Sequence, residues 1–229
     1  MTVVSIHQPA YIPWLGYFHK ISQSDVHVFY DDAEYSKNNF FNRNKIKTPQ
    51  GECWLTIPVE YHSAQNINQT KIIPNTNWQK NHWQTIRGNY ARAPYFKEYE
   101  DFFAAFYQKQ WNYLSALTME MNKAICRLLG IKTKFFISSE LGVSGKSNEK
   151  LINICAAVGA DTYLSGKGAV DVSANPYGKP YLDIGLFKKA GIGVKVQEFQ
   201  HPAYKQIYGE FTPNLSILDF IFNCGLDII

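Results

Sequence analysis

The chain has 229 residues, enough for one good hydrophobic core, and its 45% hydrophobic and 18% charged residues are typical of a globular protein. The formal net charge of +4 is spread out with no basic run, which argues against nucleic acid as a partner but allows an anionic small ligand. No apolar stretch reaches membrane-spanning length and no signal peptide is recognisable, so we expect a cytoplasmic protein without a membrane partner.

The first element is a short β-branched apolar run at residues 3–6, typical of a buried strand. It is followed at once by the polar pair His7-Gln8 and by two prolines, Pro9 and Pro13, that stiffen the chain. Residues 14–21 then carry apolar side chains at helical spacing. A strand that ends in polar residues and leads into a helix is where open α/β sheets bind ligands.

The rest of the chain alternates between the two kinds of element. In the first half we predict a strand at 25–30, a polar loop at 35–48, a strand at 54–59 and a mainly helical segment at about 75–128. In the second half we predict strands at 134–137, 161–164 and 194–196 and helices at 147–159, 184–189 and 215–223.

This order favours one α/β domain over residues 1–229, a Rossmann-like, mostly parallel sheet flanked by helices, with a helical insertion at about 75–128. Three predicted strands end in polar or glycine-containing pairs: His7-Gln8, Asp31-Asp32 and Ser165-Gly166. Because the carboxyl ends of parallel strands lie at one edge of a sheet, we expect these pairs to converge.

His7 is the best candidate for a general base, since a histidine near neutral pKa can take a proton from a reacting group. Asp31 or Asp32 could orient it or bind a substrate ammonium, although either could instead cap a turn. His82, beside a tryptophan on a predicted helix, is a second base or an ordinary structural histidine.

Several other residue types suit a ligand that carries phosphate and a ring. Arginine and lysine in the polar loop could hold a pyrophosphate with the flanking asparagine amides, unless the loop is simply solvated. The glycine-containing loop after the fifth strand could hold a phosphate through backbone donors, and aromatic rings could stack on a base or sugar. The candidate binding residues are Gln8, Tyr11, Trp14, Asp32, Lys37, Asn42, Arg43, Asn44, Ser165, Gly166, His201 and Tyr204.

The four cysteines, Cys53, Cys126, Cys155 and Cys224, are far apart and follow no metal-site or redox spacing. No acidic cluster beyond Asp31-Asp32 has metal-ligand spacing. We therefore expect no metal, no disulfide and no tightly bound cofactor.

Taken together, the motifs resemble the WbqC-like family over nearly the whole chain. The resemblance is carried by His7-Gln8-Pro9…Tyr11…Pro13-Trp14-Leu15-Gly16-Tyr17-Phe18, Asp31-Asp32…Lys37…Asn42-Arg43-Asn44…Ile46, Gly51…Trp54-Leu55-Thr56-Ile57-Pro58-Val59, Ser138-Ser139, Gly159-Ala160-Asp161…Tyr163-Leu164-Ser165-Gly166, His201-Pro202…Tyr204…Gln206 and Ser216-Ile217-Leu218-Asp219…Phe222-Asn223.

The resemblance implies a place in bacterial O-antigen and surface-polysaccharide synthesis. From it we expect an N-acyltransferase, acyl or aminoacyl, acting on a nucleotide-linked (dTDP-type) amino sugar. The acyl thioester donor would be coenzyme A or the phosphopantetheine of an acyl carrier protein, which would then be a protein partner.

Two alternatives stay open at this point. The opening also resembles, less closely, the strand–HxGH–helix start of nucleotidyltransferases, which have a second histidine three residues after the first. Here that residue is Ala10, although nucleotidyl or adenylyl transfer through the His7 loop is still a hypothesis. The other alternative is a non-catalytic nucleotide-sugar-binding protein.

Overall fold

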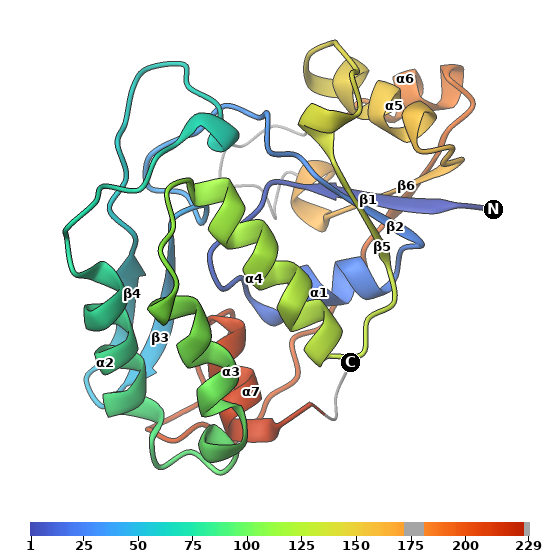
Figure 1. Ribbon diagram of the computed structural model, residues 1–229. Coiled ribbons are helices and arrows are strands. Elements are labelled where there is room, and N and C mark those ends of the chain that lie inside the picture. The colour runs from blue at the N-terminus through green and yellow to red at the C-terminus, as the bar shows by residue number, and fades with distance from the viewer. Residues whose placement is uncertain (172–180, 227–229) are drawn as a thin grey trace. The chain divides into compact units, whose positions relative to one another are not determined.

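The chain folds into two compact units, seen in a computed structural model that describes residues 1–171 and 181–226 (Figure 1). The first unit comprises Met1–Gln8, His19–Asp32 and Ile131–Gln200, and the second comprises Pro9–Phe18, Ala33–Gly130 and the segment from His201. The single domain predicted over 1–229 stays a prediction beside this division. No helix within the described ranges has both the length and the apolar character to cross a membrane.

The first unit is built on a five-stranded sheet in the order β5-β2-β1-β6-β7, and every neighbouring pair is parallel. Its strands are β1 (Val3–His7), β2 (Val26–Phe29), β5 (Lys134–Ile137), β6 (Thr162–Ser165) and β7 (Gly193–Val196). The predicted α/β class with a mostly parallel sheet is therefore confirmed. The strand predicted at 161–164 begins and ends one residue later, so that Ser165 is its last residue.

Strand β1 is central, with Val4 opposite Val26 on one side and opposite Tyr163 on the other. One face of the sheet carries apolar side chains, and α5 (Ser147–Ala157) and α6 (Ile184–Lys189) pack on it. There Val4 packs in one cluster with Ile154 of α5 and Phe187 of α6. Side chains alternate along a strand, so Ser5 and His7 point to the opposite face. Helix α1 (Leu15–Ser22), which begins in the second unit and ends in the first, follows β1 in the chain.

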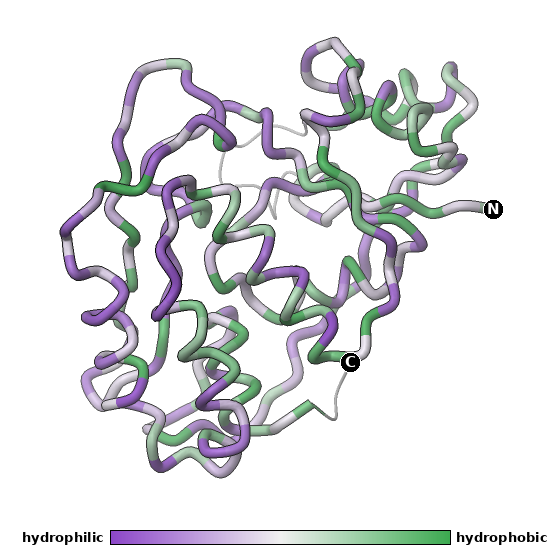
Figure 2. Tube along the Cα trace, viewed as in Figure 1, coloured by the Kyte–Doolittle hydropathy of each residue, from purple (hydrophilic) through white to green (hydrophobic). Residues whose placement is uncertain are grey.

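The second unit holds the helices predicted for about 75–128, now resolved as α2 (Trp78–Tyr90), α3 (Phe96–Gln108) and α4 (Leu114–Leu128). Figure 2 shows hydrophobic and hydrophilic residues alternating along α3 and α4, as expected for helices with one buried face. The core is aromatic. Phe222 of α7 (Ile217–Cys224) lies 4.9 Å from Phe96 and 5.3 Å from Phe103 between ring centroids.

The main error of the sequence-based prediction concerns residues 35–59. The segment predicted as a loop contains β3 (Arg43–Thr48), which pairs antiparallel with β4 (Gly51–Thr56) in a separate two-stranded sheet. The strand predicted at 54–59 is thus shifted and lies outside the parallel sheet. The run Arg43–Thr48 is polar, yet half of its residues are buried. Its sequence does not alternate between apolar and polar residues, so the pattern typical of a half-buried strand is missing.

The proline-containing segment at 9–18 is held by specific contacts within the second unit. Ile12 has φ of 38°, a left-handed conformation that a β-branched residue adopts only when its surroundings impose it. The Asn44 amide donates to the Ile12 carbonyl at 2.8 Å and so fixes this turn. Two residues further on, the Trp14 indole lies against Gly16, where a Cβ atom would come within 2.3 Å of the ring.

Because Gly16 has this contact and Gly88 of α2 has none, we predict opposite effects on stability when each is replaced by alanine. Gly16→Ala should lower the free energy of unfolding by roughly 1–3 kcal/mol, because the indole must move to admit the methyl group. Gly88→Ala, at an exposed position of α2 where a Cβ atom would meet nothing within 4 Å, should raise the free energy of unfolding by about 0.5–1 kcal/mol. Urea unfolding followed by far-UV circular dichroism measures both, and equal shifts in one direction would contradict the role of Gly16.

Candidate functional site

The clearest site in the first unit is a crevice of about 410 Å³ at the carboxyl edge of the parallel sheet. Numbered along the chain, the sheet order is 3-2-1-4-5, so the connections that follow β1 and β6 lead to opposite sides. Ligands of open α/β sheets bind outside the strand ends at this switch point. Gln8 follows β1 and Gly166 follows β6, and both line the crevice with His7. Three of the residues predicted to converge therefore lie together.

The crevice also contains a buried cation, Lys20 of α1. Its side chain is only 4% exposed, and its ammonium donates one hydrogen bond, to the Ile6 carbonyl at 3.3 Å. Across residues 1–171 and 181–226 no carboxylate forms an ion pair with it, whereas the unit's other buried lysine, Lys150, is paired with Asp32 at 2.8 Å. Burial without a counter-ion lowers the pKa of Lys20 to about 7.

His7, the last residue of β1, is half-buried beside this cation. Its Nδ1 lies 3.0 Å from the Gln8 carbonyl oxygen, which only accepts, so Nδ1 carries the proton and Nε2 has the lone pair. Burial, and next the charge of Lys20, lower the pKa of His7 to about 3, although the bond to Gln8 opposes the shift. The imidazole is therefore neutral at pH 7 and able to accept a proton at Nε2.

The loop after β6 forms one wall of the crevice. Gly166 and Gly168 line it, and a Cβ atom at Gly166 would meet nothing within 4 Å. Ser165 is buried, and its hydroxyl donates to the Gly166 carbonyl at 3.2 Å, which directs the side chain toward its own loop. The polar lining is completed by Tyr30, which follows β2, and by Ser147 and Asn148 in the first turn of α5.

The aspartate pair after β2 is engaged elsewhere in this unit and does not line the crevice. Asp31 accepts bonds from the backbone amide and the hydroxyl of Ser139, at 3.0 and 2.7 Å. Asp32 accepts from Lys150. Their predicted roles, orienting His7 or binding an ammonium, stay predictions.

The remaining candidate residues belong to the second unit, where Tyr11 and His82 form a buried chain. The Tyr11 hydroxyl lies 2.8 Å from His82 Nδ1 and 2.8 Å from the Tyr107 hydroxyl, and His82 Nε2 lies 3.2 Å from the Thr56 carbonyl. Because the carbonyl fixes the proton on Nε2, Nδ1 accepts from Tyr11. Burial lowers the pKa of His82 to about 4. Both nitrogens of His82 are thus committed to the core, and its role as a base stays a prediction.

The polar residues around β3 divide into buried amides and two cations, the half-buried Arg43 and the exposed Lys37. Asn42 donates to the Ile57 carbonyl at 2.8 Å, and Asn44 holds the Ile12 turn. Arg43 bonds to Asn38 and lies 4.3 Å from the Trp54 ring, while Lys37 lies 4.0 Å from the Tyr61 ring. Phosphate binding by Arg43 and Lys37 stays a prediction.

The last three candidates lie around the start of α7. His201 stacks between Trp14 and Tyr204, with centroids 6.2 and 6.1 Å away. Tyr204 donates to the buried carboxylate of Asp219 at 2.8 Å. That carboxylate also accepts from Tyr90 and Gln206, each at 2.8 Å, so it is satisfied by neutral donors although burial raises its pKa.

Within the described ranges no group of three or more histidine, cysteine or acidic residues is placed to hold a metal ion, and the four cysteines are free thiols. The residues that sequence reasoning missed are Lys20, Tyr30, Ser147 and Asn148. For Lys20 the signal was available, because it is a lysine within an apolar helical run directly after the β1 turn.

Comparison with known proteins places the chain in a family. Residues 8–229 match the WbqC-like protein family, and the chain belongs to it. It is 37% identical over 231 residues to the uncharacterized protein Rv1507c of Mycobacterium tuberculosis, covering 99% of this chain and 96% of that protein. No solved structure matches the chain.

The lowered pKa of Lys20 predicts a pH-dependent effect of Lys20→Met on stability. Below about pH 7 the ammonium is buried at a cost of several kcal/mol, which the isosteric methionine avoids, so the variant should be the more stable protein there. From pH 7 to about 10.5 the unfolded chain binds the Lys20 proton and the folded chain does not, so wild-type stability rises relative to the variant.

The difference in unfolding free energy, measured by urea denaturation from pH 6 to 9, should therefore shrink as pH rises. Exposed Lys132→Met, outside the crevice, is the matched control and should show no such trend. A difference that is independent of pH for Lys20→Met would mean that this lysine is not buried as an ion.

Proposed function

We propose that the protein is an N-acyltransferase, acyl or aminoacyl, that forms an amide on a nucleotide-linked (dTDP-type) amino sugar in O-antigen biosynthesis. The acyl group comes from a coenzyme A or carrier-protein thioester, and His7 is the general base. The observation that carries the proposal is that one switch-point crevice contains both a neutral imidazole and a buried, unpaired ammonium.

The nucleotide part of the substrate is supported by the sheet. The order 3-2-1-4-5 matches the first five strands of the 3-2-1-4-5-6 order on which dinucleotide-binding proteins build their crevice. A phosphate beside Lys20 supplies the counter-charge that this ammonium lacks, and a pair of unit charges 4 Å apart is worth about 4 kcal/mol at an effective dielectric constant of 20. An anionic ligand therefore relieves the largest electrostatic cost in the crevice.

Amide formation requires one proton to be moved. The sugar amine attacks the thioester carbonyl carbon, His7 Nε2 takes the proton that the amine loses, and the carbon–sulfur bond then breaks. The departing thiolate receives that proton from the His7 imidazolium, so the enzyme returns to its starting state. A positioned base of this kind contributes ~10²–10⁴-fold to the rate.

Substrate binding also strengthens the base. The charge of Lys20 is one of the two causes that lower the pKa of His7, and a phosphate next to Lys20 offsets that charge. His7 is a weak base in the free protein and becomes a stronger one when the anionic substrate is bound.

Nucleotidyl or adenylyl transfer is the second candidate, favoured by the placement of His7 at the end of β1 ahead of α1. It lacks the second histidine, since Ala10 stands there, and it would use Mg²⁺ to bridge phosphates. The two reactions differ in co-substrate, which makes them separable by assay.

We predict that amide product forms from a dTDP-amino sugar and an acyl thioester, and that EDTA does not reduce the rate. Aminolysis of a thioester needs only a base, charge stabilisation and positioning. The assay follows amide formation by mass spectrometry with coenzyme A and carrier-protein thioesters, with and without chelator. Product that requires a nucleoside triphosphate and Mg²⁺ would replace acyl transfer with nucleotidyl transfer.

His7→Asn is the variant that tests the base in the same assay, because asparagine keeps polarity but cannot take the proton. Turnover should fall by at least ~10²-fold while dTDP-amino sugar binding stays within a few-fold. Full activity in His7→Asn would remove His7 from the base role, and binding of the dTDP-amino sugar without any turnover by the wild type would make this a non-catalytic binding protein.

A further inference from the structure

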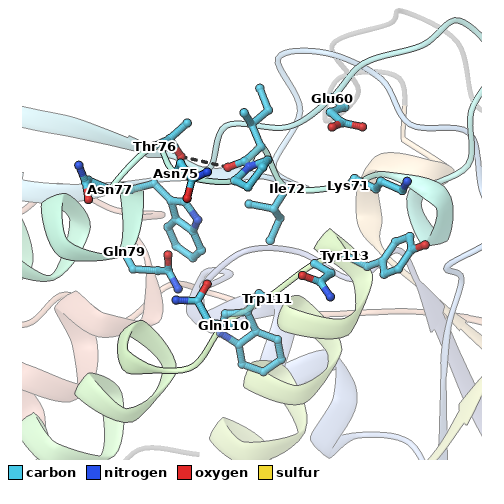
Figure 3. Close-up of a pocket in the computed structure, with 14 residues that line it drawn as sticks. Glu60, Lys71, Ile72, Asn75, Thr76, Asn77, Gln79, Gln110, Trp111 and Tyr113 are labelled. Atoms are coloured by element: carbon cyan, nitrogen blue, oxygen red, sulfur yellow. Dashed lines mark hydrogen bonds between the residues drawn. The ribbon is translucent and has the colours of Figure 1, made fainter.

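A second cleft, of about 480 Å³, lies entirely within the second unit (Figure 3). It is formed by the segment before α2, the first turn of α2 and the α3–α4 connection. Figure 3 shows Gln79, Gln110 and Trp111 along one side, with Glu60 and Lys71 at the opposite end. None of the residues that line it takes part in the crevice of the first unit.

The walls of the cleft are fixed by backbone hydrogen bonds. Lys71 and Tyr113 form an antiparallel bridge, and the amide of Ile72 donates to the Asn112 carbonyl at 2.9 Å. On the other side, the Glu60 amide donates to the Lys71 carbonyl at 2.9 Å. The side chains therefore project from a pre-formed frame, which lowers the entropy that a ligand would lose on binding.

The polar groups of the cleft are mainly carboxamides. Five of its side chains are asparagine or glutamine, and within the described residues only that of Gln79 forms a hydrogen bond to protein; those of Asn75, Asn77, Gln110 and Asn112 form none. A carboxamide both donates and accepts, as does a hydroxyl group, so such a set matches a ligand with many hydroxyls.

The charge of the lining argues for a neutral ligand. Glu60 and Lys71 are its charged side chains, and their formal charges cancel. An anion would meet one carboxylate and no excess of cations, in contrast to the crevice that contains Lys20.

The cleft also contains an exposed aromatic ring, that of Tyr113. Tyr113 is 42% exposed, whereas the face of Trp111 is covered by the Lys109 ammonium 4.3 Å away. The Tyr113 ring thus offers an apolar surface next to the amides, suited to the C–H face of a sugar ring. The volume lies within the ~300–1,000 Å³ range of ligand pockets.

We propose that this cleft binds a neutral saccharide, with Tyr113 stacking on a sugar ring and the Gln110 and Asn112 amides bonding to its hydroxyls. The site does not depend on the acyltransferase function, since it uses none of the same residues.

The experiment titrates the full chain with unphosphorylated glucose, galactose, N-acetylglucosamine, maltose and chitobiose, and detects binding by saturation-transfer NMR. At least one sugar should bind, and Tyr113→Ala and Gln110→Ala should each weaken it tenfold or more. Gln108→Ala, an exposed glutamine of α3 outside the cleft, is the matched control and should bind as wild type does.

Unfolding midpoints of all variants are compared first. Both substituted side chains are exposed and the bridge uses backbone atoms, so Gln110→Ala carries the test if Tyr113→Ala is unstable. Lys20→Met should leave saccharide binding unchanged.

Three results would overturn the proposal. One is that none of the five sugars binds. Another is binding that Lys20→Met removes and Tyr113→Ala does not, which places the sugar in the first crevice. The third comes from a parallel titration with glucose 6-phosphate: if this sugar phosphate binds, the five neutral sugars do not, and Lys71→Met abolishes its binding, then the ligand is an anion.

Discussion

The parallel pairing of β1 with β2 on one side and β6 on the other is the constraint on which the first unit depends. Because β1 is central and all neighbouring strands run the same way, every strand ends at one edge of the sheet. The connections after β1 and β6 lead to opposite sides of the sheet, and the crevice lies between them at the strand ends. The position of His7 beside Gly166 follows from this topology, although 159 residues separate them in the chain.

Lys20 gives that crevice its chemical character. Its ammonium is buried with one long hydrogen bond and, among residues 1–171 and 181–226, no carboxylate partner, which is costly, and proteins keep such groups where a ligand completes them. Lys150 shows the contrast in the same unit, because Asp32 neutralises it and it takes no part in the crevice. We therefore assign Lys20 to ligand binding and Lys150 to a structural ion pair with Asp32.

Sequence reasoning succeeded where local pattern and topology agree. The β-branched run before His7 and the glycines after β6 predicted both strands and their meeting point. It failed for Arg43–Thr48, because a polar strand buried by tertiary contacts has no periodic signature. The hydrogen bonds that Asn44, His82 and Tyr204 form within the second unit could not be foreseen, since an amide that fixes a turn and one that binds a phosphate look the same in sequence.

The central claim is that Lys20 makes the switch-point crevice a site for the phosphates of a nucleotide. The most direct measurement is the affinity for thymidine diphosphate by calorimetry from pH 7.5 to 9, where the terminal phosphate is almost fully ionised, in wild type and Lys20→Met. Since the pKa of Lys20 is about 7, affinity should fall as pH rises in wild type and should be weak and independent of pH in the variant. Equal affinities in the two proteins, or a wild-type affinity that does not change with pH, would contradict the claim.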